Sequence, residues 1–582
     1  MPGYWNRILF VDLSSSQTWT DSLDAEIWAK YIGGVGIGSY LFDRYGGDHD
    51  AFSPSNPIII TTGPLVGTAF PNTGRHEIVS RSPQTSLLGE SNSGGHFGYM
   101  LKRAGYDGII IKGAASEPVT IFITPEKVWI ENASSLWGLD IYRVQEKIKQ
   151  SGSYSVMAIG PAGENKVLFS AVMNDEGRAA GRTGIGAVFG SKNLKAIAVK
   201  GNLIPQLANK IEFNKLSSRL AKEIFETPIS SGFRSYGSMI WIDGGQGFGD
   251  VPANYFKDHD FTYDTLSAMA FHESFKVSSY HCSSCVIGCG RTITTETGTV
   301  DGPEYETVAA FGSLLGNTDL GKIVAWNHAV NSLGLDSIST GVFVAALRSY
   351  LNTGILKDSK IVEYFDGSLN NIGKLIEDIA YARGIGKDLA VGLEKFALGR
   401  GIDKDQIATV KGLEIPMHDP RAFKLQGLGY ATSSRGADHM QADMYQVDIG
   451  GAHEEIGITM GDRWNVDSDD RVMSLIKTQD YRQVYNSAIL CYYAQPSPAD
   501  LLKGLNLATG SELTLEELMQ AGSNIVTLKR KINESLGLKS EDDWLPALAR
   551  KNIENEPEES GTGDEQLKAL LERYYRLRNW SR

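Results

Sequence analysis

Three of the chain's four cysteines lie close together, in the segment HCSSCVIGCGR (281–291). Cys282, Cys285 and Cys289 follow the spacing C-x2-C-x3-C, and the fourth thiol among 582 residues is Cys491. Three near thiolates and a distant one suit a [4Fe–4S] cluster, which takes four. A zinc ion with four thiolate ligands is an alternative, although zinc sites usually pair two C-x2-C knuckles. A third reading leaves Cys491 as an ordinary buried thiol.

Two glycine-rich stretches could bind phosphate. ESNSGGHFG (90–98) contains Gly94 and Gly95, and NDEGRAAGRTGIG (174–186) contains Arg178. Glycine lets a backbone approach a phosphate closely, exposed amides donate hydrogen bonds to it, and a guanidinium group binds it with paired N–H donors. A pair of tight turns would explain the same pattern without a ligand.

Two other glycine-rich stretches do not fit nucleotide binding. GGVGIG (33–38) follows a predicted helix, DAEIWAKYIGG, whereas a dinucleotide fingerprint must follow a strand. GAVFGSK (186–192) resembles a P-loop, but Ser191 precedes Lys192 and the glycine spacing is wrong. We therefore expect neither NAD nor ATP to bind.

Composition is that of a soluble globular enzyme. Hydrophobic residues make up 42% and charged residues 21%, and the net charge is −13 without a block of Lys or Arg. This balance argues against a nucleic-acid or anionic-membrane partner. The N-terminus lacks the pattern of a signal peptide, and no apolar run reaches the roughly 18 residues of a membrane span. Few, clustered cysteines indicate ligands rather than disulfides, so we expect a reducing cytoplasm.

The expected fold class is α+β, with a β-rich N-terminal domain over residues 1–205. Short β-branched runs bounded by turn residues fill this part, such as NPIIITTGPL, DGIIIKG and LKAIAVKG. From about residue 206 apolar residues recur at helical spacing, as in KIEFNKLSSRLAKEIFET and STGVFVAALRSYLNTG. We expect two mostly helical domains, 206–410 with three cysteines and 411–582 with the fourth. A polar loop over 551–566 should precede a final amphipathic helix.

These segments together resemble the tungsten-containing aldehyde:ferredoxin oxidoreductases over nearly the whole chain. The resemblance rests on ordered blocks that include TTGPLVGTAFPNTGRHEIVSRSP, SNSGGHFGYMLKRAGYDGIIIKG, MNDEGRAAGRTGIGAVFGSKNLKAIAV, CSSCVIGCGR, DGPEYETVAAFGS, HDPR and GLGYATSSRG. It implies a tungsten atom held by the dithiolene sulfurs of two pterins beside a [4Fe–4S] cluster. It also implies a β-rich base covered by two helical domains.

The resemblance assigns cofactor-binding residues one by one. Cys282, Cys285, Cys289 and Cys491 would ligate the cluster. Arg75 would lie between pterin and cluster and donate hydrogen bonds to both. Backbone carbonyls at Asn92 and Ala179 would hold a Mg²⁺ ion that links the pterin phosphates. Arg178 would contact a phosphate, and we add three further candidates from the same two glycine-rich stretches: Gly94, Gly95 and Arg182.

Two short motifs carry the family's pterin-binding pattern D-x-x-G-L-(C/D). They align with NSLGLD (Asn331, Gly334, Leu335 and Asp336) and with NSAILC (Asn486, Leu490 and the fourth cysteine). Asparagine replaces the opening aspartate in both, and the second motif also lacks glycine. An amide can still pair with a pterin edge as donor and acceptor, but it brings no negative charge. We therefore expect these changes to bear on the redox potential and on the choice between tungsten and molybdenum.

Glu306 in DGPEYE and His439 in RGADHM match the family's active-site glutamate and histidine. Without the resemblance, Glu306 reads as an acid in the first turn of a helix, and His439 as an ordinary core or surface residue. With it, the implied reaction converts an aldehyde and water to a carboxylic acid. Glu306 would accept a proton from the attacking water, and His439 would hydrogen-bond the oxygen on which charge develops.

The resemblance also bears on partners. The family's homodimers bridge subunits through a metal bound by E-x-x-H, and the chain reads AWNH (325–328), so we expect that bridge to be absent. Electrons would pass to ferredoxin or a ferredoxin-like small subunit. An alternative is the tungsten subunit of an aromatic acyl-CoA (benzoyl-CoA type) reductase, which needs one more cysteine than the chain has. A non-catalytic, zinc-stabilised scaffold would leave the phosphate and pterin segments unexplained.

Overall fold

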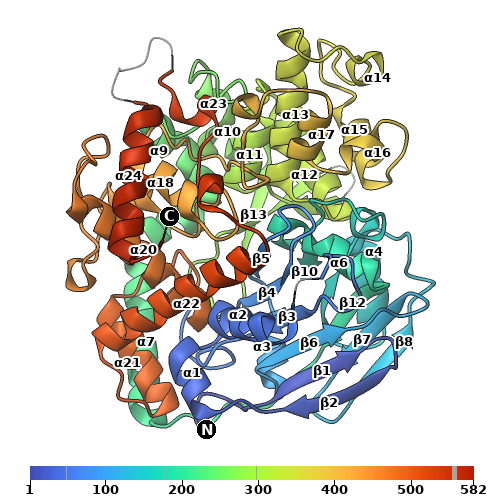
Figure 1. The fold of residues 1–582 in the computed structure, drawn as a ribbon. Coiled ribbons are helices and arrows are strands. Elements are labelled where there is room, and N and C mark those ends of the chain that lie inside the picture. Colours follow the sequence, from blue (N-terminus) through green and yellow to red (C-terminus); the bar gives the residue numbers. More distant parts are fainter. Residues whose placement is uncertain (48, 176, 296–297, 554–559, 582) are drawn as a thin grey trace.

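The computed structural model describes residues 1–47, 49–175, 177–295, 298–553 and 560–581 (Figure 1). The strands of the N-terminal part are β1 (Ile8–Asp12), β2 (Gln17–Asp21), β3 (Ile58–Thr61), β4 (His76–Arg81), β5 (Leu88–Ser93), β6 (Gly108–Lys112), β7 (Val119–Ile123), β8 (Val128–Asn132), β9 (Ser155–Ala158), β10 (Val172–Asn174), β11 (Arg178–Ala180) and β12 (Leu194–Val199). Its helices are α1 (Ala25–Tyr31), α2 (Gly34–Tyr45), α3 (Phe97–Arg103), α4 (Ile141–Lys149), α5 (Pro161–Glu164) and α6 (Ile185–Ser191). The prediction of a β-rich N-terminal part is confirmed.

These strands form two six-stranded sheets, ordered β2-β1-β6-β3-β4-β5 and β11-β10-β9-β12-β7-β8. Alternate residues of β6 pack into two different cores. Ile109 and Ile111 face the second sheet, and Ile110 lies in the core on the opposite face of the first sheet. The core between the sheets also includes α3 and α6. Helices α1, α2 and α22 (Leu515–Ser535) cover the outer face of the first sheet, and α4 covers the second. Burial on both faces explains the continuous isoleucine runs.

The rest of the chain is mostly helical, as predicted. Its remaining helices are α7 (Lys210–Glu226), α8 (Pro228–Tyr236), α9 (Ile240–Gly245), α10 (Ala268–Ser274), α11 (Tyr305–Phe311), α12 (Leu320–Leu333), α13 (Ser337–Asn352), α14 (Ser359–Val362), α15 (Ile372–Ala380), α16 (Gly386–Leu389), α17 (Leu393–Gly399), α18 (Lys424–Thr432), α19 (Met444–Val447), α20 (Asp469–Ala488), α21 (Pro498–Thr509), α23 (Ala547–Arg550) and α24 (Gly563–Arg578). One continuous apolar cluster runs through both predicted helical domains. Within the described residues, no helix is long and apolar enough to cross a bilayer.

Two small sheets interrupt the helices, and the sequence did not indicate them. Strands β13 (Lys276–Tyr280), β14 (Gly290–Thr295) and β15 (Gly298–Asp301) form an antiparallel sheet around the cysteine segment. Strands β16 (Thr409–Val410) and β17 (Leu413–Glu414) form a hairpin that spans the predicted boundary at residue 410. At the other end, α24 already begins inside the predicted polar loop 551–566, of which residues 554–559 lie outside the described part.

The two glycine-rich stretches whose pattern does not fit nucleotide binding, 33–38 and 186–192, allow close packing of the backbone. A Cβ on Gly34 of α2 would lie 2.1 Å from the carbonyl oxygen of Asn486 in α20, and one on Gly190 of α6 would lie 1.9 Å from that of Gly163. Glycine therefore lets α2 approach the end of α20, which carries one of the predicted pterin residues. Lys192 donates hydrogen bonds to the carbonyls of Pro54 and Gly113 and is structural.

A buried ion pair joins α3 to the residue before β6, and we expect its loss to destabilise the fold. Lys102 of α3 lies 2.5 Å from Asp107, and both side chains are excluded from solvent. Lys102 also donates to the carbonyl of Gly3. Asp107→Ala should lower the free energy of unfolding by about 3–5 kcal/mol, because it leaves a buried ammonium group without its counter-charge. Urea unfolding measures the effect. Asp43→Ala at an exposed position should change it by less than about 0.5 kcal/mol, and an equal loss in both variants would contradict the argument.

Candidate active site and cofactor cavities

The three clustered cysteines lie on one loop of a β-hairpin. Strands β13 and β14 pair with Tyr280 opposite Gly290, so the intervening residues form a loop that carries all three thiols. The backbone N–H groups of Ile287 and Gly288 point at the sulfur of Cys285, at 3.3 and 3.4 Å. Donors in this arrangement stabilise a thiolate or a cluster sulfur.

Asn72 joins this loop to the distant fourth cysteine. Its backbone N–H donates to the carbonyl of Ser284 at 2.7 Å, and its own carbonyl accepts the N–H of Cys491 at 2.9 Å. Its side-chain amide lies 3.5 Å from the sulfur of Cys285. All four cysteines consequently line one cavity of about 270 Å³. Burial raises the pKa of Cys491 to about 11, so a bound metal centre would have to displace a thiol proton.

A second cavity, of about 300 Å³, gathers most of the predicted pterin residues. Ten of them line it: Arg75, Asn92, Gly94, Arg178, Ala179, Arg182, Asn331, Asp336, Asn486 and Leu490. They come from the residue before β4, from β5 and the residue after it, from β11 and the turn after it, and from the ends of α12 and α20. Three other predicted residues, Gly95, Gly334 and Leu335, do not line this cavity.

Those three residues hold the walls in place. Gly95 has φ +98° and accepts the N–H of Ser283, which fixes the glycine turn against the cysteine loop. Gly334 ends α12 in the left-handed conformation, with φ +77°, and its carbonyl accepts the N–H of Ala171. Leu335 is buried. The NSLGLD motif is therefore the last turn of α12 and the connection to α13, and it joins the helical part to the N-terminal part.

Asp336 has a structural partner as well as a place in the cavity. Its carboxylate caps α13 by accepting the N–H groups of Ile338 and Ser339. It also lies 3.3 Å from Nε of Arg182. The first pterin motif thus keeps one acidic group at the cavity although Asn331 replaces the expected aspartate.

Several arginine nitrogen atoms at this cavity carry N–H groups that donate no hydrogen bond. Among the described residues, Nε and Nη2 of Arg178, Nη1 of Arg182 and Nη1 of Arg482 have no hydrogen-bond partner. Buried N–H donors without a partner are costly, so these atoms are suited to an anionic ligand such as a phosphate. The donor set therefore fits a phosphorylated cofactor, and the four thiols fit a metal cluster.

The two cavities meet at a common wall that contains both predicted catalytic residues. Residues lining both are Arg75, Arg178, Glu304, Glu306, His439, Met440 and Tyr492. Arg75 donates from Nε to Asn92, and a Cβ on Gly94 would lie 3.3 Å from Nη1 of Arg75 and 2.8 Å from the sulfur of Cys282. Arg75 thus lies between the cysteines and the second cavity.

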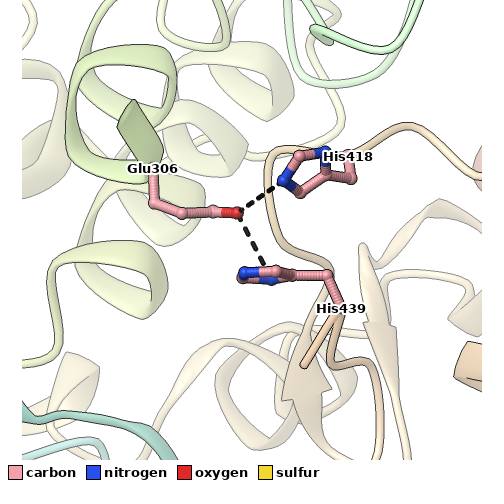
Figure 2. Close-up of side chains that lie close together, drawn as sticks. All are labelled: Glu306, His418 and His439. Carbon is pink, nitrogen blue, oxygen red and sulfur yellow. Dashed lines mark ion pairs between the residues drawn. The ribbon is translucent and has the colours of Figure 1, made fainter. Parts of the chain in front are cut away.

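Glu306 and His439 face each other at this wall. Glu306, in the first turn of α11, places Oε1 at 3.4 Å from Nδ1 of His439 (Figure 2). About 15% of each side chain remains exposed, toward the cavities. The backbone N–H of Met417 donates to the other carboxylate oxygen at 2.9 Å.

A second histidine, His418, joins them and was missed by the sequence analysis. Its Nε2 lies 3.6 Å from Oε1 of Glu306 (Figure 2), and its ring stacks on Tyr445. Its Nδ1 lies 2.6 Å from Oδ2 of Asp250, which also accepts the indole N–H of Trp241 at 2.7 Å. A proton on Nδ1, donated to Oδ2, would leave the Nε2 lone pair facing Glu306. The HDPR block contains His418, but nothing in the sequence points to Asp250.

Burial sets the protonation of this group. It raises the pKa of Glu306 to about 8, against the hydrogen bond from Met417, which lowers it. Burial lowers the pKa of His418 and of His439 to about 3, and the nearby His418 adds to the effect on His439. At neutral pH both imidazoles are therefore neutral, and Glu306 is mostly protonated, with the ionised form as the minor one.

Two family models cover nearly all of the chain. The model described as "Aldehyde ferredoxin oxidoreductase, N-terminal domain" matches residues 8–201, and "Aldehyde ferredoxin oxidoreductase, domains 2 & 3" matches residues 215–582. The chain belongs to the aldehyde ferredoxin oxidoreductase family. It is thus an oxidoreductase, and the resemblance inferred from the sequence is confirmed.

Individual relatives agree with this family. The chain is 36% identical over 597 positions to the tungsten-containing aldehyde ferredoxin oxidoreductase of Pyrococcus furiosus, covering 100% of this chain and 97% of that protein. The aliphatic sulfonate oxidoreductase WOR-like subunit of the same organism is 32% identical, with 75% of each chain covered. A similar solved structure is the active-site complex BamBC of benzoyl coenzyme A reductase with 1,5-dienoyl-CoA. It has a TM-score of 0.86 at 25% identity, over 100% of this chain and 95% of that chain.

Proposed function

We propose that this enzyme oxidises aldehydes to carboxylic acids at a tungsten or molybdenum bis-pterin and passes the electrons through a [4Fe–4S] cluster to ferredoxin or a ferredoxin-like subunit. The observation that carries the proposal is the position of Glu306 and His439 at the wall shared by the cysteine cavity and the cavity of unpartnered arginine donors. Family membership supports the same reading.

The residues present suggest how each group would be held. The four cysteines would ligate the cluster. Asn92, Ala179, Arg178 and Arg182 would face the pterin phosphates and their Mg²⁺ ion. When bound, the metal–pterin centre supplies the two-electron redox chemistry that no side chain here can provide. We propose further that residues 1–205, 206–410 and 411–582 are the three domains that contribute these ligands.

The side chains at the shared wall would handle the substrate's protons. Ionised Glu306 is positioned to accept a proton from the water that attacks the aldehyde carbon. His439 is neutral at physiological pH, so it can donate one hydrogen bond to the carbonyl oxygen, where negative charge develops. Trp241, Tyr305 and Tyr445 line the cavity beside these groups and would exclude bulk water.

The pH dependence of the reaction follows from Glu306. Its pKa of about 8 means that the basic form is the minor one at neutral pH. We expect kcat/KM for an aldehyde to rise about tenfold per pH unit below pH 8 and to level off above it. His439 should add no inflection between pH 5 and 9, because its pKa lies far below this range. Anaerobic assays with a viologen dye as acceptor measure the profile; a rate that falls from pH 6 to 8 would contradict the assignment.

A benzoyl-CoA-type reductase subunit is the second candidate. The similar BamBC structure favours it. The cysteine count opposes it, because the chain has four cysteines and all four line one cavity. If all four ligate the cluster, no cysteine is left as the additional tungsten ligand that this type of subunit would need.

Elemental analysis and a substrate assay test the proposal together. Anaerobically purified protein should contain about one W or Mo and about four Fe per chain and should reduce a viologen with aldehydes. Zinc without W, Mo or Fe, from a host able to make the cofactor, would overturn it. Full metal content with activity toward an aromatic acyl-CoA but not toward aldehydes would favour the second candidate.

A further inference from the structure

We infer that Glu306, His418 and His439 form a binding site for a divalent first-row transition metal ion such as Zn²⁺, and that the ion inhibits the enzyme by occupying these groups. Each side chain offers one ligand atom, and the three atoms lie within 4.8 Å of one another. Metal binding rests on the geometry alone, whereas inhibition rests on the proposed function.

The ligand atoms of this group converge without other hydrogen-bond partners. Among the described residues, Oε1 of Glu306 and Nδ1 of His439 are buried and accept or donate no hydrogen bond. Figure 2 shows both imidazole rings directed at the same carboxylate oxygen. Buried polar atoms normally have partners, so this convergence indicates a ligand that binds all three.

The distances between the ligand atoms suit a zinc ion. Zinc binds histidine nitrogen and carboxylate oxygen at about 2.0–2.2 Å, so neighbouring ligands of a tetrahedral ion lie about 3.3–3.6 Å apart. Oε1 of Glu306 lies 3.4 Å from Nδ1 of His439 and 3.6 Å from Nε2 of His418. Two of the three distances between ligand atoms thus already match this range. The cavity beside them leaves room for water as a fourth ligand.

Neighbouring side chains support His418 as a ligand. A metal-binding histidine usually donates its other ring N–H to a carboxylate, which fixes the ring and its tautomer. Asp250 is placed to accept such a bond, with Oδ2 at 2.6 Å from Nδ1 of His418, and Trp241 donates its indole N–H to the same oxygen. Two imidazoles and one carboxylate are ligands that Zn²⁺ and Fe²⁺ prefer, whereas Ca²⁺ and Mg²⁺ prefer oxygen ligands alone.

The test must separate this site from the cysteines, which could also bind zinc. Holoenzyme with about four Fe per chain meets this need, because its cysteines are occupied. Crystals soaked in zinc chloride should show an anomalous peak at the zinc edge about 2.0–2.2 Å from the three ligand atoms. A peak at another place, or none, would overturn the site.

Variants measure the contribution of each group in solution. Equilibrium dialysis of the holoenzyme against zinc should find one additional ion per chain. His418→Gln and Asp250→Asn should each weaken zinc binding by about 10–100-fold, the second by releasing the His418 ring. His49→Gln, at an exposed position, should bind zinc like the parent enzyme. Unchanged affinity in both site variants would contradict the proposal.

Inhibition kinetics test the second half. Zinc should raise KM for the aldehyde in proportion to its concentration while kcat stays constant, and a chelator should reverse the effect. Inhibition that lowers kcat alone would overturn competition at this site. Protein that binds zinc at the three side chains but oxidises no aldehyde would support the site and contradict the proposed function.

Discussion

The Glu306→Gln enzyme is expected to keep its metal content and lose aldehyde oxidation, with kcat lower by about 10²–10⁴-fold. Glutamine has nearly the same shape and can still accept the N–H of Met417, so the first turn of α11 should be preserved. It cannot take up a proton at neutral pH. The loss should therefore appear in kcat rather than as unfolding or a missing cofactor.

Two comparisons make this result specific. Glu146→Gln removes the same charge from an exposed position on α4 and should have the parental kcat. The residual activity of Glu306→Gln should also lack the rise toward pH 8 that the parent enzyme shows. Undiminished aldehyde oxidation in a Glu306→Gln protein with normal W, Mo and Fe content would remove Glu306 as the base.

Cys491→Ala should have the second largest effect. The residue is placed beside the cysteine loop by the bond from its N–H to Asn72, so it can supply the fourth thiolate. Its loss leaves three protein ligands for a cluster that takes four. We expect iron to fall well below four atoms per chain, and dye reduction to fall to background because electrons cannot leave the redox centre.

Iron analysis and electron paramagnetic resonance of the dithionite-reduced protein measure this change. Ser279→Ala, on exposed β13 next to the loop, should keep both the iron and the signal. Iron content equal to that of the parent would show that Cys491 is not a ligand. Loss of zinc rather than iron, with activity retained, would favour the zinc alternative.

The sequence predicted those parts of the fold whose signal is local. Isoleucine runs of β3 and β6 read as buried strands because each residue is apolar, and the structure buries both faces. The role of glycines 33–38 was not visible, since it depends on a carbonyl of Asn486 that is distant in sequence. The hairpin that carries three cysteines was also missed, because its strands are short and polar.

The residues of the candidate site also divide into those that the sequence indicated and those that it did not. Glu306 and His439 were found through the family pattern, and the structure brings them within 3.4 Å of each other. Their roles remain predictions. Asp250 and His418 contact each other across 168 positions of sequence. A lone aspartate between glycine and valine gives no sign that it orients a histidine, so only tertiary packing could identify this pair.

The make-up of the second cavity has a consequence for maturation. Its walls come from β5 and β11, which are synthesised early, and from the end of α20, which is synthesised late. A cofactor bound in this cavity would contact segments that are synthesised far apart in time. We therefore expect loading to be coupled to the docking of α20 rather than to follow it as an exchange with free cofactor. Chains that complete α20 before the cofactor arrives would have to reopen the contact between α2 and α20, where glycine permits unusually close approach.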